Sequence, residues 1–129
     1  YDIAVELKTM KEARETIEKN MLSRSVLVRQ ELPAAEQEID FAEAKAIIEI
    51  VSQIDDKGKA VGNAESRKAQ LTIALATNPE YQIAKSQRAE IQGKLDTLDA
   101  HIASDERRYS SAKHSLAYKQ AALNLLGGA

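Results

Sequence analysis

Residues 79–126 read PEYQIAKSQRAEIQGKLDTLDAHIASDERRYSSAKHSLAYKQAALNLL, and this stretch decides the fold. At steps of three and four it carries one almost wholly apolar stripe, which predicts a single long helix that packs a narrow face against a partner helix. Asn78 as capping residue and Pro79 at the first helical position mark its start, and two glycines after Leu126 mark its end. The stripe consists of Ala84, Ile91, Leu95, Leu98, Ile102, Asp105, Tyr109, Ala112, Leu116 and Leu123.

A second stripe at the N-terminal end of the chain predicts the partner helix. It steps by four and three, and Arg14 and Arg24 or Ser25 fill its two polar positions. Polar residues in such a seam set register or oligomer state, and this structural role is favoured over ligand binding for both arginines. The apolar members are Ile3, Leu7, Met10, Ile17, Met21 and Val28.

Pro33 interrupts this first helical stretch. Proline lacks a backbone N–H and crowds the preceding turn, so either a kink or a helix break is predicted. Strong helix formers on both sides favour the kink. The stripe resumes through Ala35, Ile39, Ala42, Ala46 and Ile50.

The stretch 55–63, DDKGKAVGN, is the clear loop, because two glycines and polar neighbours end a helix and Asn63 can cap the next one. Helices over about 3–32, 33–55, 64–76 and 79–126 then make an all-α fold with one domain, residues 1–129. We expect a long antiparallel coiled-coil helical hairpin with a Pro-kinked first arm and a short third helix at its tip.

The apolar residues near the tip form the candidate oligomer or partner interface. The segment 47–54 is apolar on more than one face, and the short helix is predicted to fold back and cover it. Because a two-helix hairpin buries little surface per residue, self-association is predicted through this tip or along the hairpin flank. The candidate interface residues are Ile47, Ile48, Val51, Ile54, Leu71, Ile73 and Leu75.

Composition limits the chemistry that the chain can perform. It has no cysteine, 18 basic and 20 acidic residues, and a net charge of −2, so any nucleic-acid binding must be local. No apolar run of about 18 residues and no signal-peptide pattern occur, which predicts no membrane span and a cytoplasmic location. His101 and His114 lack partners at metal-ligand spacing, and no catalytic set is recognised. We therefore expect no enzyme, no cofactor and no metal site.

Four basic residues gather near the predicted tip. Flexible cations beside the amides of a glycine loop and a helix start could hold a sugar-phosphate backbone without reading its sequence. The alternative is a solubilising charged turn, in which Asp55, Asp56 and Glu65 offset the positive charge. The candidate nucleic-acid contacts are Lys57, Lys59, Arg67 and Lys68.

The order of elements resembles small helical phage proteins encoded among recombination and replication genes and, more distantly, the UvsY family of recombination mediators. The resemblance covers residues 30–123 and rests on the Pro-containing helix, the basic glycine loop and three short motifs. These motifs are Ser66-Arg67-Lys68-Ala-Gln-Leu71, Asn78-Pro79-Glu80-Tyr81 and Leu95-Asp96-x-Leu98.

The resemblance implies a helical homo-oligomer that binds single-stranded DNA and helps to load a recombinase onto strands coated by a single-strand-binding protein. It also implies that Lys57, Lys59, Arg67 and Lys68 contact DNA, repeated around a ring. This chain differs from the family in having no aromatic residue near the loop and a slightly negative charge. The rival interpretation is a coiled-coil adaptor or inhibitor that binds a protein and no nucleic acid.

Overall fold

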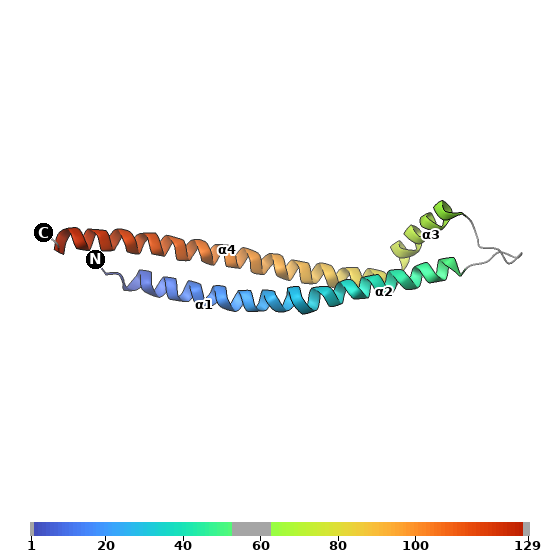
Figure 1. The fold of residues 1–129 in the computed structure, drawn as a ribbon, viewed down its shortest axis with the longest axis horizontal. Coiled ribbons are helices and arrows are strands. Elements are labelled where there is room, and N and C mark those ends of the chain that lie inside the picture. Colours follow the sequence, from blue (N-terminus) through green and yellow to red (C-terminus); the bar gives the residue numbers. More distant parts are fainter. Residues whose placement is uncertain (1, 53–62, 128–129) are drawn as a thin grey trace, which may run out of the picture. The chain divides into compact units, whose positions relative to one another are not determined.

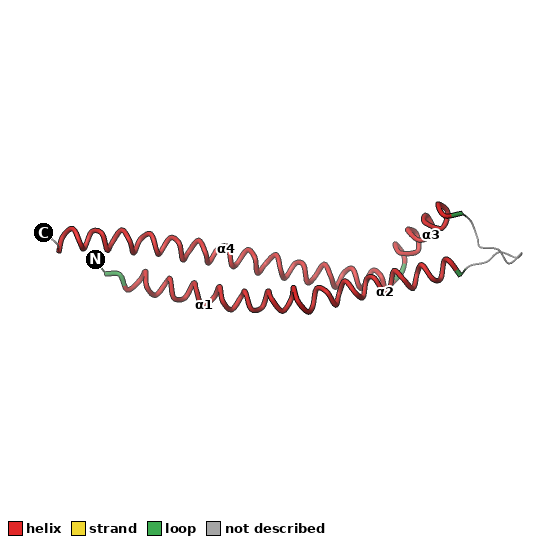
Figure 2. The backbone as a smooth tube through the Cα atoms, viewed as in Figure 1, coloured by secondary structure: helices red, strands yellow, loops and turns green. Residues whose placement is uncertain are grey.

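A computed structural model describes residues 2–52 and 63–127 of the chain, and every regular element in these ranges is helical (Figures 1 and 2). No strand occurs in them. The all-α fold predicted from the heptad stripes is thus confirmed. The elements are α1 (Ala4–Val26), the π-helical turn η1 (Leu27–Glu31), α2 (Leu32–Val51), α3 (Ala64–Thr77) and α4 (Pro79–Gly127).

Both capping residues expected from the sequence begin a helix. The Asn63 side-chain oxygen accepts a hydrogen bond from the backbone N–H of Ser66 at 2.8 Å, and α3 follows. The Asn78 side-chain oxygen accepts from the backbone N–H of Tyr81 at 3.0 Å, and α4 follows with Pro79 as its first residue. Each cap satisfies a backbone donor that a helix start leaves unpaired.

Pro33 lies in the first turn of α2, directly after the π-helical turn. The backbone stays helical there, because Glu31 before α2 has φ −75° and ψ −43°. A proline ring would clash with the carbonyl of Arg29 in a regular α-helix, and a wider turn removes this clash. The irregularity at Pro33 is therefore a π turn within a continuous helical backbone, not a break.

The described residues divide into two compact units, and the single domain stays a prediction. The first unit pairs α1 with the part of α4 from Lys94 onward (Figure 1). Near the start of α1, Glu6 bonds Lys119, and near its end the Arg24 Nε–H donates to Asp99 at 2.6 Å. From Glu6 to Arg24 along α1, the bonded partner on α4 changes from Lys119 to Asp99, which lies earlier in the sequence. The two helices are therefore antiparallel.

The second unit contains α2, α3 and the start of α4. Arg88 pairs with Glu36 at 3.2 Å, and Lys45 pairs with Glu80 at 3.2 Å, so α2 and α4 are also antiparallel. Helix α3 packs on α2, as expected for a helix that covers the apolar end of α2. Each unit therefore shows the antiparallel helical pairing predicted for the hairpin.

Alanine dominates the buried seams of both units. On α2 the predicted stripe is confirmed, because four of its five members are buried and Ile39 is half-buried. On α4 the predicted members are buried or half-buried except Leu123, which is exposed. Small side chains let two helix axes approach closely, but each buries little area. The buried apolar residues are Ala13, Leu27, Ala35, Ala42, Ala46, Ile50, Ala84, Leu95 and Ala112.

The seam predicted for α1 is wrong at every second position. Leu7, Met21 and Val28 are exposed, as is Arg14, whereas Ile3, Met10, Ile17 and Arg24 lie in the seam as predicted. The residue before each wrongly placed position occupies the seam instead, namely Glu6, Ala13, Asn20 and Leu27. The cause is the π turn, which inserts one extra residue and shifts the phase of α1 by one position relative to α2.

Candidate functional site

The candidate nucleic-acid site is described only in part. Arg67 and Lys68 lie near the start of α3, held there by the Asn63 cap, with Arg67 half-buried and Lys68 exposed. Lys57 and Lys59 lie outside the described residues, as does the interface candidate Ile54. The structure therefore gives the geometry of two of the four predicted cations.

Arg67 and Lys68 line a pocket of about 230 Å³ between α2 and α3, which we call the α2–α3 pocket. Its other walls are aliphatic, so cations and apolar side chains share one site. The structure thus brings together members of the two sets that the sequence suggested separately. The described residues that line it are Ile47, Ile50, Val51, Ala64, Arg67, Lys68 and Leu71.

Three interface candidates lie outside this pocket. Ile48 on α2 and Ile73 on α3 are exposed, and Leu75 is half-buried. Helix α3 therefore covers Ile50 but leaves part of the apolar surface open, so the predicted cover is incomplete.

Arg67 and Lys68 give the α2–α3 pocket its positive charge. Within residues 2–52 and 63–127, neither Arg67 nor Lys68 forms an ion pair. Among the described residues that line the pocket none is aromatic, so these residues offer a nucleobase no stacking surface. The arrangement can bind phosphate or carboxylate groups, with apolar contact beside them.

A polar cluster in the first unit was missed by the sequence interpretation, which placed Leu7 in the seam. Glu6 is only 7% exposed, and its Oε1 accepts hydrogen bonds from Lys119 Nζ at 2.5 Å and Ser115 Oγ at 3.2 Å. The hydrogen bond from Lys119 is the largest of several effects that lower the pKa of Glu6 below the ordinary value of 4.5, although burial acts in the opposite direction. The cluster fixes the register of α1 against α4.

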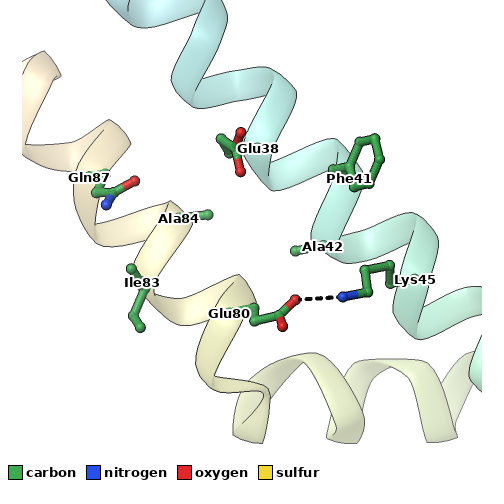
Figure 3. A pocket seen from close by; sticks show the side chains of 8 residues that line it. All are labelled: Glu38, Phe41, Ala42, Lys45, Glu80, Ile83, Ala84 and Gln87. Carbon is green, nitrogen blue, oxygen red and sulfur yellow. Dashed lines mark hydrogen bonds and ion pairs between the residues drawn. The ribbon is translucent and has the colours of Figure 1, made fainter.

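A groove between α2 and α4 in the second unit was also missed, and we call it the α2–α4 groove. It has a volume of about 430 Å³. Figure 3 shows Ala42 and Ala84 pointing toward each other across it, with the Lys45–Glu80 ion pair at one end. Phe41 and Ile83 flank it and are 69% and 58% exposed. Glu38 and Gln87 complete the lining.

Metal ligands do not converge in the described ranges: no group of three or more histidine, aspartate and glutamate residues there could hold an ion. His101 and His114 are both exposed. None of the helices in the same ranges has an apolar stretch of the length that a bilayer requires.

Comparisons of this chain with protein-family models, with curated proteins and with solved structures found no match.

Proposed function

We propose that this protein is a phage-type recombination or replication accessory protein that binds single-stranded DNA as a homo-oligomer and acts like a recombination mediator. The observation that carries the proposal is the α2–α3 pocket, which Arg67 and Lys68 both line and where neither has an ion-pair partner among the described residues. Lys57 and Lys59 belong to the same proposed surface by their place in the sequence.

The proposed mechanism is electrostatic and independent of base sequence. Each subunit offers a few cations, and each cation that neutralises a phosphate releases a counterion, so affinity falls steeply with salt. Linked copies in an oligomer raise the affinity by about two to four orders of magnitude. The proposed partners are a recombinase or a single-strand-binding protein, in the cytoplasm of the host cell, and the protein itself catalyses no reaction.

The test is a fluorescence polarisation titration with a labelled single-stranded oligonucleotide at low and high salt. We expect binding at low salt that weakens as salt rises. The variant Arg67→Ala/Lys68→Ala should bind more weakly, and its log–log salt slope should be smaller by about 0.7 for each cation removed. Adding Lys57→Ala and Lys59→Ala should abolish binding while the helix content stays unchanged.

The matched control is Lys11→Ala/Arg14→Ala, which removes the same charge from exposed positions of α1. This control should bind DNA like the wild type. If both double variants weaken binding equally, net charge and not the pocket would account for the affinity. If the wild type fails to bind at low salt, the DNA-binding proposal is refuted.

The rival function is a coiled-coil adaptor or inhibitor that binds a protein through apolar surface. The observation in its favour is the amount of such surface in the second unit, where Phe41, Ile48, Val51, Ile73 and Ile83 are all more than half exposed. Exposed apolar side chains mark a protein interface where they form a contiguous patch. An absence of DNA binding at low salt would favour this function.

A further inference from the structure

One flank of α2 presents four residues in the spacing that receives a side chain from another helix. Glu38, Phe41, Ala42 and Lys45 stand at positions i, i+3, i+4 and i+7, and all four line the α2–α4 groove (Figure 3). In coiled coils, four residues at this spacing form the hole into which a knob of the facing helix inserts. Ala42 is only 6% exposed and faces Ala84 of α4 across the groove, and its small side chain adds little bulk to that side of the hole (Figure 3).

The same flank also carries a knob. Phe41 is 69% exposed, and it is the single phenylalanine of the chain. A surface that holds both a knob and a hole is complementary to itself, which is the requirement for a two-fold symmetric interface.

We propose that α2 of a second copy of this chain docks antiparallel on this flank, around a two-fold axis between Phe41 and Ala42. Each Phe41 then enters the hole of the other copy. Because the axis lies midway between positions 38 and 45, Glu38 of one copy comes level with Lys45 of the other. The contact repeats on both sides of the axis.

The charges of the flank fit this pairing. Glu38 has no ion-pair partner among residues 2–52 and 63–127, so its carboxylate is available. Lys45 pairs with Glu80 of its own chain at 3.2 Å, but an ammonium group has three donors and can bridge to a second carboxylate. Two ion pairs of this kind, one on each side of the axis, would set the register and orientation of the two copies.

The corresponding flank of α4 fits a second copy less well. Its hole consists of Glu80, Ile83, Ala84 and Gln87 at the same spacing. Antiparallel self-docking there would bring Glu80 level with Gln87, so no opposite charges would meet. The pairing of Glu38 with Lys45 therefore selects α2.

This inference rests on the self-association that the proposed function requires, and it names the surface that would provide it. Its test measures association between two copies and not DNA binding. The proposed dimer can therefore be refuted while DNA binding is observed, and DNA binding can be refuted while the dimer is observed.

Site-directed cross-linking tests the arrangement in the full chain, which has no natural cysteine. Glu38→Cys and Lys45→Cys proteins are prepared separately, mixed, and oxidised under mild conditions. We expect the mixed disulfide between the two variants to form at least tenfold faster than the disulfide of either variant alone, because positions 38 and 45 are level and neither is level with itself. A mixture of Glu38→Cys with Lys11→Cys is the control and should cross-link at the slow rate.

Light scattering provides the second measurement, on chains that keep both charges. Phe41→Ser should raise the concentration needed for dimer formation at least tenfold. Tyr118→Ser, which removes an aromatic side chain that is 72% exposed on α4, should leave it unchanged. Equal disulfide rates in all mixtures, or a monomeric wild type at about the 100 µM concentrations at which weak dimers form, would overturn the proposal.

Discussion

Glu6 is the residue at which the seam of α1 departs most clearly from an apolar pattern. A carboxylate buried between two helices is unfavourable unless it is paired, and Lys119 and Ser115 provide that pairing from α4. Its second oxygen, Oε2, is buried and has no hydrogen-bond partner in residues 2–52 and 63–127. The cluster therefore contributes more to the choice of register than to the free energy of unfolding.

The lowered pKa of Glu6 predicts how stability depends on pH. The folded state favours the carboxylate, so the contribution is fully present above the ordinary value of 4.5 and is lost as the pH falls through the lower, folded-state value. We expect the difference in free energy of unfolding between the wild type and Glu6→Gln to be constant near neutral pH and to shrink below pH 4.5. Urea denaturation at a series of pH values measures it.

The control for that series is Glu12→Gln, because Glu12 is an exposed carboxylate on the same helix. Its difference from the wild type should not follow the same curve. A Glu6→Gln difference that stays the same down to about pH 2 would show that the Lys119 contact does not favour the ionised form.

The helix caps were the features that the sequence predicted best. Asn63 and Asn78 cap their helices as expected, because an N-cap depends only on the residues that follow it. The burial of Glu6 and Ala13 could not be predicted in the same way. It depends on which side of α1 faces α4, and that depends on a backbone irregularity elsewhere in the chain.

At the scale of elements, η1 explains the error in the predicted seam. The predicted stripe through Leu7, Met21 and Val28 lies at heptad spacing from Ala35 and Ala42, so these predicted members before and after Pro33 share one heptad phase. The π turn over Leu27–Glu31 adds one residue, and the seam before it lies one position earlier. A proline predicted an irregularity there, but its type cannot be determined from proline alone.

This explanation predicts that one residue can be removed from the π turn without loss of the seam. Deletion of the exposed residue Gln30, combined with Pro33→Ala, should convert the turn into regular α-helix. The buried residues of α1 and those of α2 should then keep their positions in the seam. We expect a free energy of unfolding within about 1 kcal/mol of the Pro33→Ala protein. Chemical denaturation with circular dichroism detection gives the comparison.

The matched control deletes Glu15, an exposed residue of α1, in the same Pro33→Ala protein. This deletion rotates one part of α1 out of the seam, and losing the burial of Leu27 alone costs about 1.5–3 kcal/mol. If the two deletions are equally destabilising, the π turn does not set the phase of α1.

The residues that line the α2–α3 pocket could not be predicted from the positions of the helices alone. The existence of α3 and its packing on α2 follow from turn signals and apolar pattern. The residues that line the pocket depend on the angle and register of that packing. Consequently Ile47, Val51 and Leu71 join Arg67 and Lys68 there, whereas Ile48 and Ile73 do not.

At the scale of the whole molecule, the described residues bury little apolar volume. No large side chain among them is less than 2% exposed, and the seams consist mainly of alanine. Chains with so small a core gain much of their stability from association, because each copy removes apolar surface of the other from water. Exposed side chains such as Phe41 and Ile83 are the natural source of that additional burial.

We therefore predict that the midpoint of thermal unfolding rises with protein concentration. For a dimer that unfolds to two chains, a 100-fold rise in concentration adds about 1.4 kcal/mol per chain, which corresponds to a shift of roughly 2–8 °C. Scanning calorimetry of the wild type, Phe41→Ser and Tyr118→Ser measures the shift. Phe41→Ser should lose the concentration dependence and Tyr118→Ser should keep it, whereas a wild-type midpoint that does not move would mean that the chain is stable without a second copy.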